Sequence, residues 1–311
     1  MVVSRSEDDV VIAGLGVPLL GDTNSNVVVE GVVDYKGHAV SDRSKYGGWK
    51  SASFVIGIEI AERFAYYGIS SNLITYLTGP LNQSTVNAAK NVNVWSGVGH
   101  ILPLLGAFVA DSYLGRYRTI VFSSLFYVLG LALLTLSTII PKERSPDCPD
   151  IEKNSSCKSP SSFQVVFFFF SLYVVAIGLA GHKSCVQAFG ADQFDGRDPV
   201  ENKSKSSFFN WWYFGLCAGA TISLFIINYI EENLNWGLGF GIPCFFMAVA
   251  LLVFLLGTKT YRYSFKDDKR SPFVRLAQVF VAAARNWRSS PSSSTALEQA
   301  KPTSHNNHQF K

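Results

Sequence analysis

Six apolar stretches constrain this chain more than any other feature of its sequence. Their approximate limits are residues 53–79, 93–112, 119–140, 163–187, 208–230 and 236–257. A helix needs about 20 apolar residues to cross the hydrocarbon layer of a bilayer. Each stretch has that length, and 48% of all residues are hydrophobic while only 16% are charged. The sequence therefore predicts an all-α membrane protein with six transmembrane helices rather than a soluble protein.

The segments outside these stretches divide the chain into three regions. Residues 1–50 carry seven acidic and five basic side chains and lack the basic start and apolar core of a signal peptide. We expect them to form an arm outside the membrane, followed by a six-helix transmembrane region at 51–258. Residues 259–311 are predicted to be a tail that is amphipathic at first and disordered where it becomes rich in serine.

Lysine and arginine positions predict the orientation, because positive charge is retained on the cytoplasmic side during insertion. With a cytoplasmic N-terminus, twenty of the 27 basic residues lie on the inner side, five in outer loops and two within stretches. Arm and tail are therefore predicted to be cytoplasmic. Because topology explains the net charge of +4, we expect no nucleic-acid partner. Plasma and vacuolar membranes impose the same hydrophobic constraint, so both stay open.

The loop at 141–162 then faces the non-cytoplasmic side. It contains Cys148 and Cys157, and the sequence Asn154-Ser155-Ser156 is a glycosylation sequon. An oxidising compartment permits the two cysteines to pair across this short loop. A Cys148–Cys157 disulfide and glycosylation of Asn154 are both left open.

Three charged residues lie within the first stretch. Glu59, Glu62 and Arg63 occupy its first half, although an ionised residue near the centre of a membrane costs about 2.5 to 3.5 kcal/mol. Spacings of three and four residues place them on one helical face, which continues through Tyr66 and Tyr67. Since lipid does not solvate such a face, we expect it to point into the bundle or into a water-filled cavity.

Two interpretations of this face stay open from the residues alone. One is a structural ion pair that holds helices together. The other is a relay for protons and substrate, because two carboxylates beside one guanidinium leave a negative charge unbalanced. Lys183, toward the end of the fourth stretch, is a second cation that could neutralise the remaining carboxylate. Alternatively its amine reaches the membrane surface.

A short turn between the second and third stretches carries charges of both signs. Asp111 precedes the turn, and Arg116 and Arg118 follow it. An acid at one helix end that faces a base at the start of the next helix would lock one arrangement of the two helices and release it in another. The other interpretation is a solvated loop.

Three segments of this chain resemble the proton-dependent oligopeptide transporters of the major facilitator superfamily, in particular their plant nitrate and peptide branch. The family's first-helix motif E-x-x-E-R-F-x-Y-Y-G is intact from Glu59 to Gly68. The turn motif at 110–117 (ADSYLGRY) and the motif at 189–195 (FGADQFD) also match. Lys183 lies where the family carries a fourth-helix lysine. The resemblance extends from about residue 47 to about residue 285.

This resemblance implies the N-terminal half of a major facilitator fold, six helices of twelve. It implies proton-coupled transport of nitrate, small peptides or related small solutes, with protons as coupling ion and no other cofactor. Glu59, Glu62, Arg63 and Lys183 would couple protons, and Tyr66, Tyr67 and Tyr213 would line the substrate cavity. Tyr213 replaces a polar asparagine of peptide-carrying members, which puts direct peptide binding in question.

An alternative function belongs to a different class. A six-helix chain without an opposing half could associate with itself or with a full-length relative and regulate it without transporting. The expected partners are thus membrane lipid, a small-molecule substrate and, in this alternative, another copy or a relative. We do not expect an enzyme, because the sequence contains no H-E-x-x-H, G-x-S-x-G or glycine-rich phosphate loop.

Overall fold

The computed structural model describes residues 29, 31–40, 42–140, 143–144, 158–264 and 272–288. Its helices are α1 (Gly48–Ser70), α2 (Leu73–Thr78), α3 (Thr85–Val109), α4 (Arg116–Ser137), α5 (Ser162–Ala191), α6 (Pro199–Asn233), α7 (Trp236–Leu256) and α8 (Pro272–Arg288). A π-helical turn, Ala110–Leu114, follows α3, and a 3-10 turn, Gly257–Lys259, follows α7. Cys148 and Cys157, whose pairing was left open, and the Asn154 sequon lie outside the described residues.

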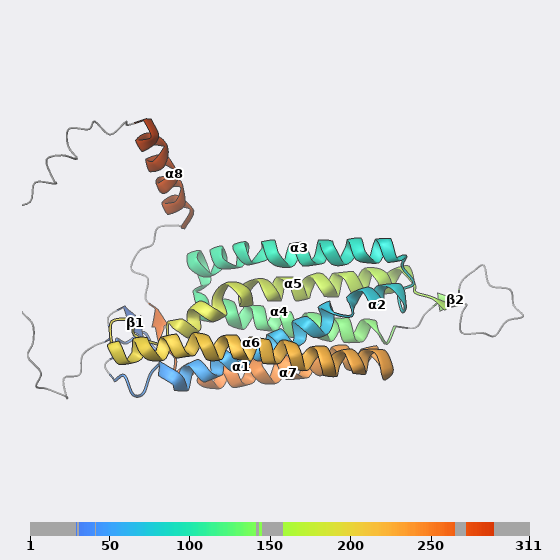
Figure 1. Ribbon diagram of the computed structural model, residues 1–311, viewed down its shortest axis with the longest axis horizontal. Coiled ribbons are helices and arrows are strands. Elements are labelled where there is room, and N and C mark those ends of the chain that lie inside the picture. Colours follow the sequence, from blue (N-terminus) through green and yellow to red (C-terminus); the bar gives the residue numbers. More distant parts are fainter. Residues whose placement is uncertain are drawn as a thin grey trace, which may run out of the picture.

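Six long helices run lengthwise side by side in one bundle, and α8 stands apart from it (Figure 1). Five helical segments in the described part of the chain are long and apolar enough to cross a membrane: Thr85–Leu114, Arg116–Ser137, Ser162–Ala191, Pro199–Asn233 and Trp236–Lys259. The remaining long helix, α1, differs because every 18-residue window within it contains Glu59, Glu62 and Arg63. The all-helical architecture is confirmed, with five rather than six strongly apolar spans.

Three predicted boundaries were wrong, each for a local reason. The first stretch is not one helix, because the chain breaks after Ser70 and resumes as α2. The second begins at Thr85, where the Ser84 side chain accepts from the backbone N–H of Asn87. The fifth begins at Pro199, well before residue 208, because Asp198 caps it by accepting from two backbone N–H groups. Polar residues thus extend these helices beyond their apolar parts.

Small residues let neighbouring helices approach closely. A Cβ atom on Gly219 of α6 would stand 2.7 Å from the carbonyl oxygen of Ile60 on α1. A Cβ atom on Gly178 of α5 would stand 2.6 Å from the backbone nitrogen of Tyr127 on α4. Such contacts replace hydrophobic side-chain packing where lipid is as apolar as the protein interior. The pairs α1–α6 and α4–α5 therefore pack backbone against backbone.

The arm and the segment after α7 meet at one end of the bundle, called here the arm end. Strand β1 (Val32–Val33) pairs antiparallel with β4 (Tyr263–Ser264), and Figure 1 shows both at that end. The opposite end, called here the α2 end, carries α2 and the two-residue strands β2 (Glu143–Arg144) and β3 (Lys158–Ser159). Residues distant in sequence are thus joined at the arm end.

Candidate functional site

The charged face of α1 is buried inside the bundle. Glu59 is 4% exposed and Glu62 is fully buried. The Nε atom of Arg63 lies 2.6 Å from Oε2 of Glu62 and 3.3 Å from Oε1 of Glu59. One guanidinium therefore forms ion pairs with both carboxylates. The pair with Glu59 follows from the i,i+4 spacing, whereas the pair with the adjacent Glu62 depends on how the two side chains are oriented.

One aromatic ring contacts both Arg63 of this ion pair and the second cation, Lys183. The centroid of the Tyr66 ring lies 5.6 Å from Cζ of Arg63 and 5.0 Å from Nζ of Lys183, which comes from α5. Tyr67 and Trp95 pack against the same ring, with centroids 5.4 and 5.9 Å away. These distances permit cation–π attraction between the ring and each of the two cations. The ring of Tyr66 thus contacts both Arg63 and Lys183.

Lys183 approaches the carboxylates less closely than the sequence predicts. Its charge interacts with those of Glu59, Glu62 and Arg63. In the part of the chain that the structure describes, however, no carboxylate oxygen lies within ion-pair distance of its amine, which contacts the Tyr66 ring instead. A direct ion pair between Lys183 and Glu59 or Glu62 would need a movement of the lysine side chain. The carboxylates can therefore gain or lose Lys183 as a partner through that movement.

Helix α6 forms the wall behind the charged face. The hydroxyl group of Ser223 on α6 donates a hydrogen bond of 2.7 Å to the carbonyl oxygen of Phe64 on α1. Gly215 and Gly219 on the same face of α6 contact Ile56 and Ile60. Because these positions are four residues apart, they form one stripe along α6. The contacts of this stripe fix the orientation of α1 about its own axis, so that its charged residues face the interior of the bundle.

Two further buried polar groups lie beside this cluster, and sequence reasoning assigned a site role to neither. Tyr127 of α4 is fully buried, interacts electrostatically with Glu62 and Arg63, and its hydroxyl has no hydrogen-bond partner among the described residues. His182 is also buried, and its Nε2 atom lies 2.9 Å from the hydroxyl of Ser124. For Tyr127 the available signal was a polar side chain in an otherwise uncharged stretch, and for His182 it was the neighbouring Lys183.

Tyr213 does not join the cluster. It is 63% exposed on α6, two residues from Gly215, whose face packs on α1. Two residues correspond to about half a helical turn, so the Tyr213 side chain points away from α1. Its assignment to a substrate cavity stays a prediction.

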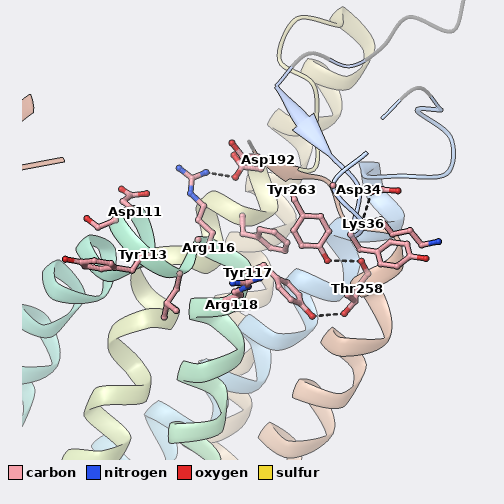
Figure 2. Close-up of a pocket in the computed structure, with 18 residues that line it drawn as sticks. Asp34, Lys36, Asp111, Tyr113, Arg116, Tyr117, Arg118, Asp192, Thr258 and Tyr263 are labelled. Atoms are coloured by element: carbon pink, nitrogen blue, oxygen red, sulfur yellow. Dashed lines mark hydrogen bonds and ion pairs between the residues drawn. The ribbon is translucent and has the colours of Figure 1, made fainter. Parts of the chain in front are cut away.

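The predicted conformational turn lies at the arm end and lines a cavity of about 670 Å³. Figure 2 shows Asp111, Arg116 and Arg118 around it, together with residues of the arm and of β4. Arg116 forms an ion pair with Asp192, the C-cap residue directly after α5. The sequence did not predict this partner, although Asp192 belongs to the motif at 189–195. The turn is therefore tied to the end of α5.

Two arginines join the arm to the helices at this end. Arg43 lies 2.6 Å from a carboxylate oxygen of Asp198 and 3.0 Å from one of Asp195. Arg262, which is 1% exposed, holds both oxygens of Glu201 at 2.5 and 3.1 Å. The pKa of Asp198 is held below its ordinary value, first by the backbone N–H of Glu201 and also by the Arg43 guanidinium.

Comparison with known proteins identifies relatives over most of the chain. The model of the POT family, PTR2, matches residues 117–311. Protein NRT1/PTR FAMILY 5.10 of Arabidopsis thaliana is 58% identical over 284 residues, which cover 91% of this chain and 48% of that protein. Protein NRT1/PTR FAMILY 8.5 of the same plant is 45% identical, covering 85% and 44%. The chain spans about half the length of these curated relatives.

Solved structures agree with this assignment. The crystal structure of the POT family transporter PepTSo is 26% identical, with a TM-score of 0.57, over 70% of this chain and 39% of that one. A peptide transporter POT crystallised with sulfate is 19% identical and shows the same fold, with a TM-score of 0.61 over 82% and 48%. The chain belongs to the POT family, in its plant NRT1/PTR branch, and is a multi-pass integral membrane protein related to transporters rather than to enzymes.

Proposed function

We propose that this chain supplies the proton-coupling half of a transporter for nitrate, small peptides or related small solutes. The observation that carries the proposal is the buried cluster of Glu59, Glu62 and Arg63 with Lys183 nearby. Intramembrane ionisable residues that face the protein interior are typical of proton and substrate pathways. The relatives' names support the substrate class, since they refer to NRT1 and PTR, and a POT relative is named a peptide transporter.

The charges of the cluster suggest how a proton and a substrate are coupled. With both glutamates ionised, two carboxylates balance the two cations Arg63 and Lys183. When one glutamate binds a proton, the cluster gains one net positive charge in surroundings of low dielectric constant, where an unbalanced charge is costly. An anionic group, such as nitrate or a peptide carboxylate, restores neutrality. Proton and anion therefore favour each other's binding.

Alternating access requires a second wall across the substrate site. Because the chain spans 48% of a relative's length, we propose that this wall comes from a complementary set of helices. We place the arm on the cytoplasmic side, in a plasma or vacuolar membrane, from the distribution of basic residues.

The test is uptake driven by an inward proton gradient, in cells that express the chain together with the complementary half of its 58% identical relative. Glu62→Gln should abolish gradient-driven uptake but leave exchange of labelled substrate, because exchange needs no net proton movement. Glu232→Gln is the matched control, since Glu232 is an exposed glutamate outside the cluster. Unchanged gradient-driven uptake in Glu62→Gln would refute the coupling role.

The second candidate is a regulatory role through association with itself or with a full-length relative. The exposed aromatic side chains Trp211, Tyr213 and Phe214 on α6, between 58% and 63% exposed, favour it. Co-expression with a full-length relative decides this point. The absence of both co-purification and any change in transport would count against regulation.

A further inference from the structure

A buried acid at the α2 end of the bundle has no part in the cluster described above. Glu231, in the last turn of α6, is 2% exposed. Its Oε2 atom accepts a hydrogen bond of 3.0 Å from the side-chain amide of Asn72, which lies at the break between α1 and α2. Its Oε1 atom has no hydrogen-bond partner among the described residues. Half of this carboxyl group is thus buried without a donor.

The surroundings are shaped to hold the side chain. A Cβ atom on Gly239 of α7 would stand 3.0 Å from both Cδ and Oε1 of Glu231. Only glycine leaves room there for the carboxyl group. The backbone N–H of Gly239 donates to Asn235 rather than to Glu231. Glu231 therefore lies in a cradle made by α6, α7 and the α1–α2 break.

No cation faces this cradle from the described segments. Residues 70–84, 131–140, 160–170 and 225–245 contain no lysine, arginine or histidine. The neighbours that interact electrostatically with Glu231 are Asn72, a neutral donor, and Glu232, a like charge that is exposed on the same helix. Glu59, Glu62 and Glu201 differ, because each of them forms an ion pair with an arginine.

A buried carboxylate with one neutral donor is strongly disfavoured, and such a group becomes neutral by taking a proton. In the neutral form, Oε2 of Glu231 still accepts the hydrogen bond from the side-chain amide of Asn72. The protonated oxygen then carries no charge and needs only one hydrogen-bond acceptor. The cluster on α1 is separate, since Ser223 marks its level on α6 and Glu231 lies eight residues further, about 12 Å along the helix axis.

We propose that Glu231 is a second proton-binding site, in which the neutral carboxyl joins the α1–α2 break to α6 and α7 through Asn72 and the cradle at Gly239. Loss of the proton places an unpaired charge in this cradle, so the side chain leaves it and the break separates from α6. The site does not depend on the transport proposal, because it shares no residue with the cluster of Glu59, Glu62, Arg63 and Lys183.

The test is infrared difference spectroscopy of the purified chain in lipid nanodiscs, titrated from acidic to alkaline pH. As the pH rises, the wild type should lose the carbonyl band of one protonated carboxyl group. The spectra of Glu231→Gln should lack this band at every pH. Glu232→Gln, the same charge change at the neighbouring exposed residue, should keep that band. The proposal is overturned if the spectrum of wild type minus that of Glu231→Gln shows, at neutral pH, only the bands of an ionised carboxylate. Bands of Glu59 and Glu62 cancel in this difference, so failure here leaves the transport proposal intact.

Two further measurements test the same site, one with the variant Asn72→Ala and one with Glu231→Gln. Asn72→Ala removes the donor that favours the ionised form, so the titration midpoint should move to higher pH, and an unchanged midpoint would contradict the assignment. In the folded state the carboxyl holds a proton that the unfolded chain releases above about pH 4.3. The folded-to-unfolded ratio of wild type should therefore fall about tenfold per pH unit relative to Glu231→Gln until the folded state also releases the proton. Parallel curves would equally overturn the proposal.

Discussion

Replacing Glu201 with glutamine should destabilise the arm end far more than a typical surface substitution. The guanidinium of Arg262 is 1% exposed and holds both Glu201 oxygens, at 2.5 and 3.1 Å. Its other acceptors are the backbone oxygens of Gln193 and Arg43, at 3.2 and 3.3 Å. Glutamine preserves the shape of Glu201 and one acceptor but removes the only counter-charge that the described residues place against this guanidinium.

The magnitude follows from two independent considerations. Two unit charges about 4 Å apart attract each other by about 4 kcal/mol at an effective dielectric constant of about 20. Breaking a buried ion pair by removing one partner costs about 3 to 5 kcal/mol, because the other charge stays buried. We expect about 3 kcal/mol for Glu201→Gln, at the lower end, since Glu201 is itself partly exposed and the remaining amide oxygen still accepts a hydrogen bond.

The assay is reversible unfolding in mixed detergent micelles, followed by tryptophan fluorescence. Glu232→Gln, at the other end of α6, serves as control and should change the free energy of unfolding by less than about 0.5 kcal/mol. The double variant Glu201→Leu with Arg262→Met should recover much of the loss, because it leaves no unpaired charge. A loss below about 1 kcal/mol for Glu201→Gln would refute the reasoning.

Three smaller predictions use the same unfolding assay. Gly219→Leu should cost at least about 1 to 3 kcal/mol, because its side chain would collide with the backbone of Ile60; wild-type stability would disprove the close packing of α1 and α6. Asp198→Ala should cost about 1 kcal/mol at neutral pH as the cap of α6 is lost. Because the pKa of Asp198 is lowered in the folded state, the difference should be full above the unfolded pKa of about 4 and should shrink as the pH falls through the lowered folded pKa; a difference that does not shrink with falling pH would contradict the contribution of the ionised cap. Arg116→Gln should cost no more than about 1 kcal/mol, because Arg116 and Asp192 are 33% and 24% exposed, and a larger loss would show that this pair is not solvent-screened.

The sequence was sufficient to predict features that depend on residues close together in the chain. Long apolar stretches predicted the helices, since hydrocarbon thickness sets their length. The spacing of Glu59, Glu62 and Arg63 predicted their common face, since helix geometry alone determines it. The motif that begins at Glu59 indicated the family, and the comparisons confirmed it.

Contacts between helices depended on the tertiary structure. The partner of Arg116 is Asp192, 76 residues away, and the partner of Arg262 is Glu201, 61 residues away. Lys183 was expected to meet a carboxylate, but the Tyr66 ring lies against it. Hydropathy and periodicity describe one helix at a time and contain no information on how neighbouring helices are rotated and shifted relative to each other.

The two glutamates at opposite ends of α6, Glu201 and Glu231, illustrate this division most clearly. In the sequence, Glu201 and Glu231 look alike, since each stands near a helix end beside other polar residues. In the folded chain, Glu201 meets an arginine and Glu231 meets only an amide. The sequence by itself determined that acids stand at these places. Only the packing of α1, α6, α7 and the segment after α7 decided which of them has a counter-charge, because that depends on side chains brought together across the bundle.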